Sequence, residues 1–147
     1  MIAVDTNVVV RFLVDDHPVE GNRARRVFED NRVLLLESVL LETEWVLRAV
    51  YDFSREEISR AIRALMALST VSVDDRMLLL NVLDSYDDGF DYADALHYAR
   101  SGGLELITFD CKFLNRSKKR NWRVNGPYAD LQPDSRAPST VVPHRRR

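Results

Sequence analysis

Four acidic residues stand where short apolar runs end or where helices are expected to begin. They are Asp5 in MIAVDTN, Glu42 in ESVLLETEWVL, Asp94 in DYADALH and Asp110 in LITFD. Asp5 and Asp110 directly follow runs that are predicted to be buried strands. Because the carboxyl ends of parallel strands share one edge of a sheet, we expect these side chains to converge there. Clustered carboxylates repel one another unless a cation lies between them, and Mg²⁺ or Mn²⁺ prefers oxygen ligands. The pattern therefore predicts a metal-dependent site.

Two of these acids have an alternative interpretation as helix caps. Asp5 precedes Thr6 and Asn7, and all three residue types accept hydrogen bonds from free N–H groups at a helix start. Asp110 can cap the turn that follows its strand in the same way, and Thr108 can be an ordinary strand residue. The cap and the metal-ligand interpretations both remain open from the sequence.

Glu42 lies in an apolar helical stretch, one turn from Val39 and from Val46. This spacing predicts that Glu42 faces buried positions, where a carboxylate is costly without a partner. A salt bridge, for example to Arg48, is the alternative to a metal ligand. Glu44, two residues further on, is predicted to point to solvent.

Asp91 and Asp94 are three residues apart at the start of a predicted helix. They therefore share one face of its first turn, where the positive end of the helix favours acids. Asp91 is interpreted mainly as a helix-start acid, with a supporting role near the site as the alternative. His97 lies one turn from Asp94, but imidazole suits Mg²⁺ poorly, so we expect it to support the ligands at most.

The chain alternates short apolar strands with amphipathic helices. Strands are predicted near residues 2–5, 33–36, 71–73, 104–109 and 122–124, and helices over 8–14, 18–30, 39–50, 55–68, 75–86 and 91–100. Ser38 and Ser54 are the expected N-caps of two helices, and Ser54 forms a capping box with Glu57. Strands separated by one or two helices favour right-handed crossovers and a mostly parallel sheet covered on both faces. The predicted fold class is α/β.

Length and composition limit the class of protein. The 147 residues suit one domain, and no apolar run approaches the roughly 20 residues that span a bilayer. The first residues lack the basic segment of a secretory signal. Cys111 is the single cysteine, which excludes an internal disulfide and fits a reducing compartment. We therefore expect a cytoplasmic protein without membrane association. The neighbouring Asp110 disfavours a thiolate, so Cys111 is not predicted to be a nucleophile.

Charge is unevenly distributed although the net charge is only −2. Five aspartates and no cation occur from residue 84 to residue 94, whereas residues 111–129 contain no acid. The basic side chains of this second segment, predicted as a loop, are Lys112, Arg116, Lys118, Lys119, Arg120 and Arg123. An acidic site beside a basic rim suits a metal-dependent nuclease, and a solvated surface loop is the alternative. Trp122 and Tyr128 could stack a base, or Trp122 could belong to the core.

Other known site patterns are missing from the sequence. It contains no phosphate-binding glycine loop, no Cys/His zinc spacing and no nucleophile elbow. Beyond residue 131 the composition turns to Pro, Ser, Thr and Arg. We therefore predict a domain over residues 1–131 and a disordered tail over 132–147.

With these acids placed, the chain resembles PIN-domain proteins of the VapC type, the toxins of bacterial toxin–antitoxin pairs. The resemblance covers about residues 1–115 and depends on VDTNVVVRFL, VLLETEWVLRAVY, DYADALHYA and LITFDCKF, in this order. It implies a three-layer α/β/α fold around a mostly parallel sheet of four to five strands. It also implies that the catalytic and metal-binding residues are Asp5, Glu42, Asp94 and Asp110.

The resemblance extends to neighbouring residues and to function. Thr108 matches a hydroxyl position near the metal, and Thr6 and Asn7 match the opening motif. The family implies a homodimeric endoribonuclease that uses Mg²⁺ or Mn²⁺ and is inhibited by a protein antitoxin. Metal-activated water would cleave RNA to leave a 5′-phosphate and a 3′-hydroxyl. Whether one or two ions bind, and which RNA is cut, stays open.

Two other functions compete with this one. A PIN-like module could bind RNA or an antitoxin with little catalysis, although the complete set of four acids favours an enzyme. A phosphoacceptor receiver or a phosphatase-like domain also uses acids at strand ends. A receiver would need paired acids directly after the first strand, yet Asp15 and Asp16 come too late. A phosphatase would need an acid where Asn7 stands.

Overall fold

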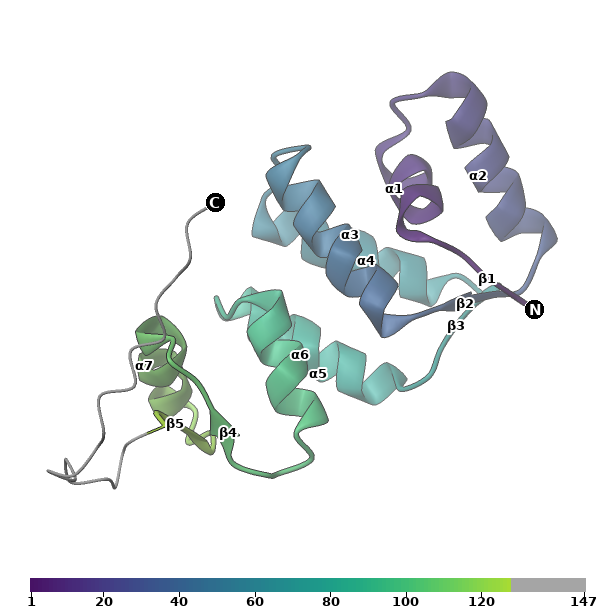
Figure 1. Ribbon diagram of the computed structural model, residues 1–147. Helices are drawn as coiled ribbons and strands as arrows, with labels where there is room; N and C mark the ends of the chain where they lie inside the picture. Colours follow the sequence, from purple (N-terminus) through teal and green to yellow (C-terminus); the bar gives the residue numbers. More distant parts are fainter. Residues whose placement is uncertain (128–147) are drawn as a thin grey trace, which may run out of the picture. The chain divides into compact units, whose positions relative to one another are not determined.

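The computed structural model describes residues 1–127, in which seven helices and five strands follow one another (Figure 1). The elements are β1 (Ile2–Ala3), α1 (Thr6–Val14), α2 (Pro18–Asp30), β2 (Val33–Leu35), α3 (Glu37–Ala49), α4 (Arg55–Ala67), β3 (Val71–Val73), α5 (Arg76–Asp87), α6 (Tyr92–Arg100), β4 (Leu106–Ile107), α7 (Cys111–Lys119) and β5 (Val124–Asn125). None of these helices is long and apolar enough to cross a membrane.

The chain divides into two compact units. The first comprises Met1–Leu104 and contains β1 to β3 with helices α1 to α6, and the second begins at Glu105 and contains β4, α7 and β5. The predicted domain limit at residue 131 and the tail over 132–147 lie outside the described residues.

The sheet of the first unit has the strand order β1-β2-β3, and both pairs are parallel. Ile2 pairs with Val33, and Val33 pairs with Val71. Because the strands are parallel, the helices α1, α3 and α5 that follow them all begin at the same edge of the sheet. The predicted α/β class is confirmed. The sheet is smaller than predicted, since among the described residues it has three strands rather than four to five.

Apolar helix faces form the core of the first unit. Helix α1 packs on α2 and α3, α4 packs on α3 and α5, and α5 packs on α6. The fully buried side chains include Leu40 and Leu47 of α3, Ile58 and Ile62 of α4, and Leu83 of α5. Removal of such apolar surface from water is the main stabilising contribution to a fold of this kind.

Two predicted helix starts are confirmed. Helix α2 begins at Pro18, and α4 follows the predicted capping box. The Ser54 backbone N–H donates to Glu57 Oε2 at 2.8 Å, and the Glu57 N–H donates to Ser54 Oγ at 3.3 Å. The bond from the Ser54 backbone N–H favours the ionised carboxyl, so the pKa of Glu57 lies below its usual value. The start of α3 was predicted wrongly, because Leu36 rather than Ser38 is the N-cap.

The second unit corrects two further predictions. The strand predicted over 104–109 is reduced to β4, which pairs in parallel with the equally short β5 in a separate two-stranded sheet. Residues 111–119, predicted as a basic loop, form helix α7, whose inner face contains Phe113 and Ser117. The ring of Trp122 lies edge-on to Phe113, with 6.4 Å between the ring centroids. This contact supports the core interpretation of Trp122, and Tyr128 lies outside the described residues.

Candidate functional site

A pocket of about 350 Å³ lies between the start of α1 and the outer side of α3. Its lining residues are Asp5, Thr6, Asn7, Val10, Arg11, Glu42, Val46, Val50 and Tyr51. The structure therefore brings together two of the four predicted acids, Asp5 and Glu42. They come from the segments that follow the adjacent parallel strands β1 and β2.

Asp5 caps helix α1. Its backbone is extended, and its Oδ1 atom accepts a hydrogen bond from the Thr6 N–H at 2.8 Å. The cap interpretation is thus confirmed, and α1 begins two residues earlier than predicted. The cap bond uses one carboxylate oxygen, so it is compatible with a second role for Oδ2 at the pocket.

Thr6 connects the two acidic segments. Its buried hydroxyl donates to Glu42 Oε2 at 2.6 Å, which ties the first turn of α1 to α3. A hydrogen bond to an ionised acceptor is roughly twice as strong as one between neutral groups. Thr6 therefore fixes the orientation of the Glu42 carboxylate at the pocket.

The predicted burial of Glu42 and Glu44 is reversed in the structure. Glu42 is exposed, whereas Glu44 is only 2% exposed. The buried residues of α3 are Val39, Leu40, Thr43, Glu44 and Leu47, and the last four follow the i, i+3, i+4, i+7 spacing of a core-facing helix. The prediction centred this stripe on Val39 and Val46; Val39 is buried, but Val46 is only half-buried, and the centre of the stripe lies one residue later. The spacing of Glu44 from Leu40 and Leu47 was the signal that could have identified it.

Arg48 pairs with Glu44 and not, as the salt-bridge alternative proposed, with Glu42. The distance from Arg48 Nε to Glu44 Oε1 is 2.8 Å, at the i, i+4 spacing. The hydrogen bond to Glu44 raises the pKa of the Arg48 guanidinium despite partial desolvation. Glu42 is therefore available at the pocket without this competing partner.

The sequence interpretation missed the cation at this pocket. Arg11 lines it and donates from Nη1 to Asp16 at 2.8 Å and from Nε to Glu20 at 2.7 Å. The hydrogen bond to Asp16 raises the pKa of Arg11. Arg11 stands four residues after Asn7 on α1, so the two residues share one face of the helix. This spacing was the signal that could have placed Arg11 at the pocket. The pocket thus combines two carboxylates with an arginine whose charge is compensated by Asp16 and Glu20.

Asp91 and Asp94 lie on α6. Asp91 is the N-cap, and its Oδ1 accepts hydrogen bonds from the N–H groups of Ala93 at 2.9 Å and Asp94 at 3.4 Å. The helix-start interpretation of Asp91 is confirmed. Asp94 is half-buried in the first turn and does not line the pocket of Asp5 and Glu42. His97 is exposed near the end of the same helix.

Asp110 belongs to the second unit, where it caps α7. Its Oδ1 accepts hydrogen bonds from the N–H groups of Lys112 at 2.7 Å and Phe113 at 3.0 Å. The Thr108 hydroxyl oxygen accepts from the Asp110 N–H at 3.0 Å, which holds the turn that precedes the helix. The cap interpretation is confirmed here as well.

The basic residues predicted to contact RNA lie on and directly after α7 and are exposed. They are Lys112, Arg116, Lys118, Lys119 and Arg120. The guanidinium of Arg120 lies over the Trp122 ring at 5.8 Å. A helix with an apolar inner face and a basic outer face can offer its cations to an anionic partner.

The donor set suits a hard divalent cation but is incomplete around the pocket. Asp5 and Glu42 contribute carboxylate oxygens, Thr6 a hydroxyl and Asn7 a side-chain amide, and Mg²⁺ and Mn²⁺ favour such oxygens. Among residues 1–127, no group of three or more Asp, Glu, His or Cys side chains is arranged to hold a metal ion. The two carboxylates at the pocket therefore need further ligands.

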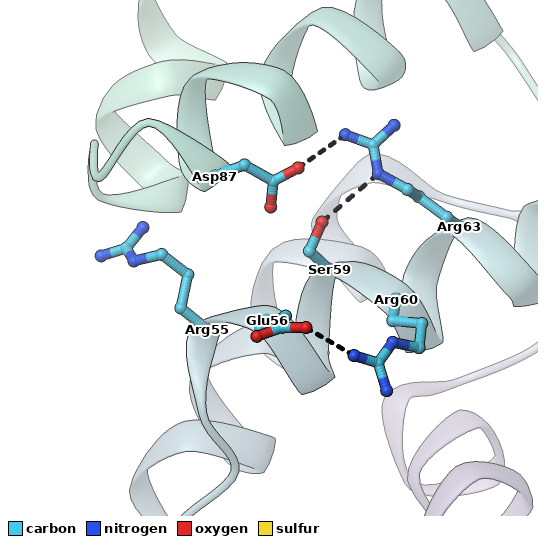
Figure 2. A pocket seen from close by; sticks show the side chains of 6 residues that line it. All are labelled: Arg55, Glu56, Ser59, Arg60, Arg63 and Asp87. Carbon is cyan, nitrogen blue, oxygen red and sulfur yellow. Dashed lines mark hydrogen bonds and ion pairs between the residues drawn. The ribbon is translucent and has the colours of Figure 1, made fainter.

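A second pocket, of about 460 Å³, lies against α4 and the end of α5 (Figure 2). It is lined by Arg55, Glu56, Ser59, Arg60, Arg63 and Asp87. Arg60 pairs with Glu56 at 2.6 Å, and Arg63 pairs with Asp87 at 2.9 Å. Since acids of the same pocket compensate these cations, it is less suited to a phosphate than a pocket with unpaired cations would be.

Comparison with known families identifies the family of this chain. A model of the PIN domain matches residues 2–119, which is more than half of the chain. The match spans all four predicted acids and the whole of α7. No curated protein matches the chain.

Proposed function

Because this chain belongs to the PIN-domain family, we propose that it is a metal-dependent endoribonuclease of the VapC type, the toxin of a toxin–antitoxin pair. PIN domains are generally metal-dependent nucleases, so hydrolysis of phosphodiester bonds is the activity that family membership supports. The observation that carries the proposal is the pocket shared by Asp5 and Glu42, with the Thr6 hydroxyl directed at Glu42.

In this proposal, Mg²⁺ or Mn²⁺ is held by the four carboxylates of Asp5, Glu42, Asp94 and Asp110. The bound ion would supply water activated near neutral pH and would offset negative charge on the phosphate. Asp5 is oriented by its cap bond, and Glu42 is oriented by Thr6. Asn7, Asp91 and Thr108 support the ligands or the substrate.

RNA, an antitoxin and a second copy of the chain are the proposed partners. Exposed cations on and after α7 would bind phosphates of the RNA backbone. The proposed homodimer and antitoxin follow from the likeness to VapC toxins.

The test is to express the protein in cells that lack an antitoxin and to map new RNA 5′ ends. The wild-type protein is expected to stop growth and to create a defined set of 5′-phosphorylated ends, and Asp94→Asn is expected to create none. Identical 5′ ends with both proteins, at equal expression, would contradict a role for Asp94. No new ends with the wild type would contradict the proposed ribonuclease.

Thr6→Val is expected to weaken Mn²⁺ binding by about 10- to 100-fold, the usual loss when a group that orients a metal ligand is removed. Valine keeps the shape of threonine but cannot donate to Glu42. Thr6→Ser keeps the hydroxyl and is the matched control, with binding expected to stay close to the wild type. Calorimetric titration with Mn²⁺ measures the affinity of both variants. Equal losses of Mn²⁺ affinity in Thr6→Val and Thr6→Ser would contradict the role of the Thr6 hydroxyl in orienting Glu42.

A further inference from the structure

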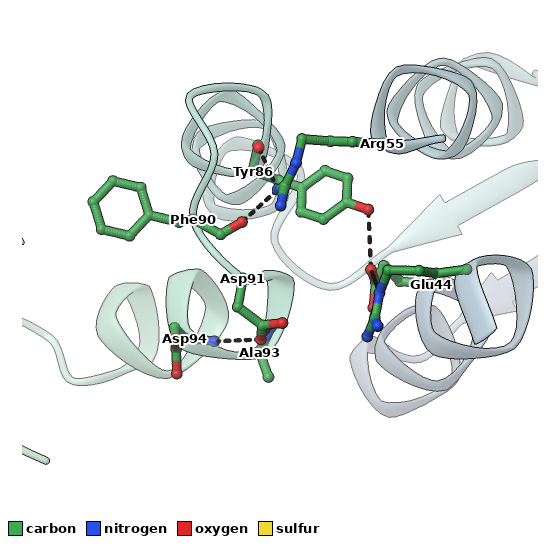
Figure 3. A network of polar contacts seen from close by, with 8 residues as sticks. Glu44, Arg55, Tyr86, Phe90, Asp91, Ala93 and Asp94 are labelled. Carbon is green, nitrogen blue, oxygen red and sulfur yellow. Dashed lines mark hydrogen bonds and ion pairs between the residues drawn. The ribbon is translucent and has the colours of Figure 1, made fainter. Parts of the chain in front are cut away.

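Glu44 is a carboxylate in the interior of the first unit. Its Oε1 atom accepts hydrogen bonds from the Tyr86 hydroxyl at 3.0 Å (Figure 3) and from Arg48 Nε at 2.8 Å. Burial of a carboxylate is unfavourable unless it is paired, and an apolar side chain at the same place is often at least as stabilising. The bonds of Glu44 therefore need an explanation other than general stability.

Tyr86 connects Glu44 to three other helices. It lies near the end of α5, its ring meets the Tyr92 ring of α6 edge-on at 5.7 Å, and the Arg55 guanidinium of α4 lies over it at 4.2 Å. Burial, with a further contribution from Glu44, raises the pKa of the Tyr86 hydroxyl. The phenol consequently stays protonated and keeps donating to Glu44.

The same contacts hold the turn between α5 and α6. Arg55 Nη1 donates to the Tyr86 carbonyl at 2.6 Å and also to the Phe90 carbonyl (Figure 3). The next residue, Asp91, caps α6, and Asp94 follows in the first turn of that helix. The position of Asp94 thus depends on a turn that is attached to Tyr86.

We propose that Glu44 is a positioning residue that fixes the start of α6, and with it Asp94, relative to Glu42. Glu44 stands two residues after Glu42 on α3 and bonds Tyr86, which leads into the turn before Asp94. Loss of the Glu44–Tyr86 bond would allow α3 to shift against α5 and α6. The inference rests on the proposed function, because Glu42 and Asp94 are proposed ligands of one metal site.

The Tyr86→Phe variant tests the positioning role of Glu44, and Tyr92→Phe is its matched control. The variant removes the hydroxyl that bonds Glu44 and keeps the ring. Tyr92→Phe removes a buried hydroxyl that has no hydrogen-bond partner among the described residues. Tyr86→Phe is expected to raise the Mn²⁺ concentration for half-maximal RNA cleavage by about tenfold or more, whereas Tyr92→Phe should leave it unchanged. Amide exchange at residues 91–94 should become faster only in Tyr86→Phe.

Glu44→Gln is the second variant. Its control is Glu56→Gln, because Glu56 also pairs with an arginine four residues later, at 2.6 Å, but on the exposed side of α4 (Figure 2). Glu44→Gln should raise the Mn²⁺ requirement and Glu56→Gln should not. A merely structural role of Glu44 would lower the melting temperature without changing the Mn²⁺ requirement of the folded protein.

The outcomes separate this inference from the proposed function. An unchanged Mn²⁺ requirement and unchanged amide exchange in Tyr86→Phe and Glu44→Gln would overturn the positioning role. Equal effects of Tyr86→Phe and Tyr92→Phe would overturn it too, because only one of these hydroxyls bonds Glu44. A wild-type protein without Mn²⁺-dependent cleavage would overturn the proposed function, and exchange at residues 91–94 would then decide whether Glu44 fixes the start of α6.

Discussion

Asp5→Asn and Asp94→Asn are each expected to lower Mn²⁺-dependent RNA cleavage by at least about 100-fold. Loss of a group that only supports a metal ligand typically costs 10- to 100-fold, so loss of a charged ligand should cost no less. The fold should survive the change in Asp5, because asparagine is as good an N-cap as aspartate and can still accept the bond from the Thr6 N–H. Cleavage of a labelled RNA by purified protein measures the effect.

Asp30→Asn is the control for these variants. Asp30 is exposed at the last position of α2, where a negative charge gains nothing from the helix dipole. The Asp30→Asn variant removes one negative charge, as the other two variants do. It therefore shows how much of the loss of RNA cleavage follows from the change in net charge alone. Full cleavage by the Asp5→Asn, Asp94→Asn double variant would refute the proposed site.

Removal of divalent metal is expected to lower the cleavage rate by about a thousandfold. A metal ion contributes several kcal/mol to a phosphoryl transition state, and about 4 kcal/mol corresponds to three orders of magnitude in rate. Chelation followed by addition of Mn²⁺ should restore the rate. Activity should also fall at acidic pH, because carboxylates must be ionised to bind the ion.

Calorimetric titration with Mn²⁺ distinguishes a metal-dependent enzyme from a module that only binds RNA or an antitoxin. Binding of Mn²⁺ by the wild type, together with loss of binding in Asp5→Asn, would support a metal-dependent enzyme. Cleavage that persists in excess chelator would exclude the proposed mechanism. Binding of RNA without Mn²⁺ uptake at neutral pH would instead favour a module that recognises RNA or an antitoxin.

Strong local signals predicted much of the fold. Pro18 and the Ser54–Glu57 box mark two helix starts, and the apolar run at 71–73 marks β3. Prediction from sequence was weaker where the length of a strand depends on pairing with a distant segment. The apolar run at 104–109 is longer than β4, because its partner β5 offers only two residues for pairing.

Prediction of the site was limited by the geometry of helix faces. Asp5 was predicted from its place after a strand and Glu42 from its place in an apolar helical stretch, and both line one pocket. The burial of Glu42 and Glu44 was reversed, because a shift of one residue rotates the apolar stripe of a helix by about 100°. Arg11 was missed because its place at the pocket depends on how α1 packs on α3. The joint metal role of Asp94 and Asp110 stays a prediction.

Each unit contains its own tryptophan, since the two tryptophans of the chain are Trp45 in α3 and Trp122 beside α7. Trp45 is 54% exposed, whereas Trp122 is half-buried against Phe113. Emission from Trp122 should therefore shift to longer wavelength when the second unit unfolds, while the exposed Trp45 should already emit near the wavelength of a hydrated indole. A Trp45→Phe variant consequently provides a fluorescent reporter that follows the loss of the second unit alone.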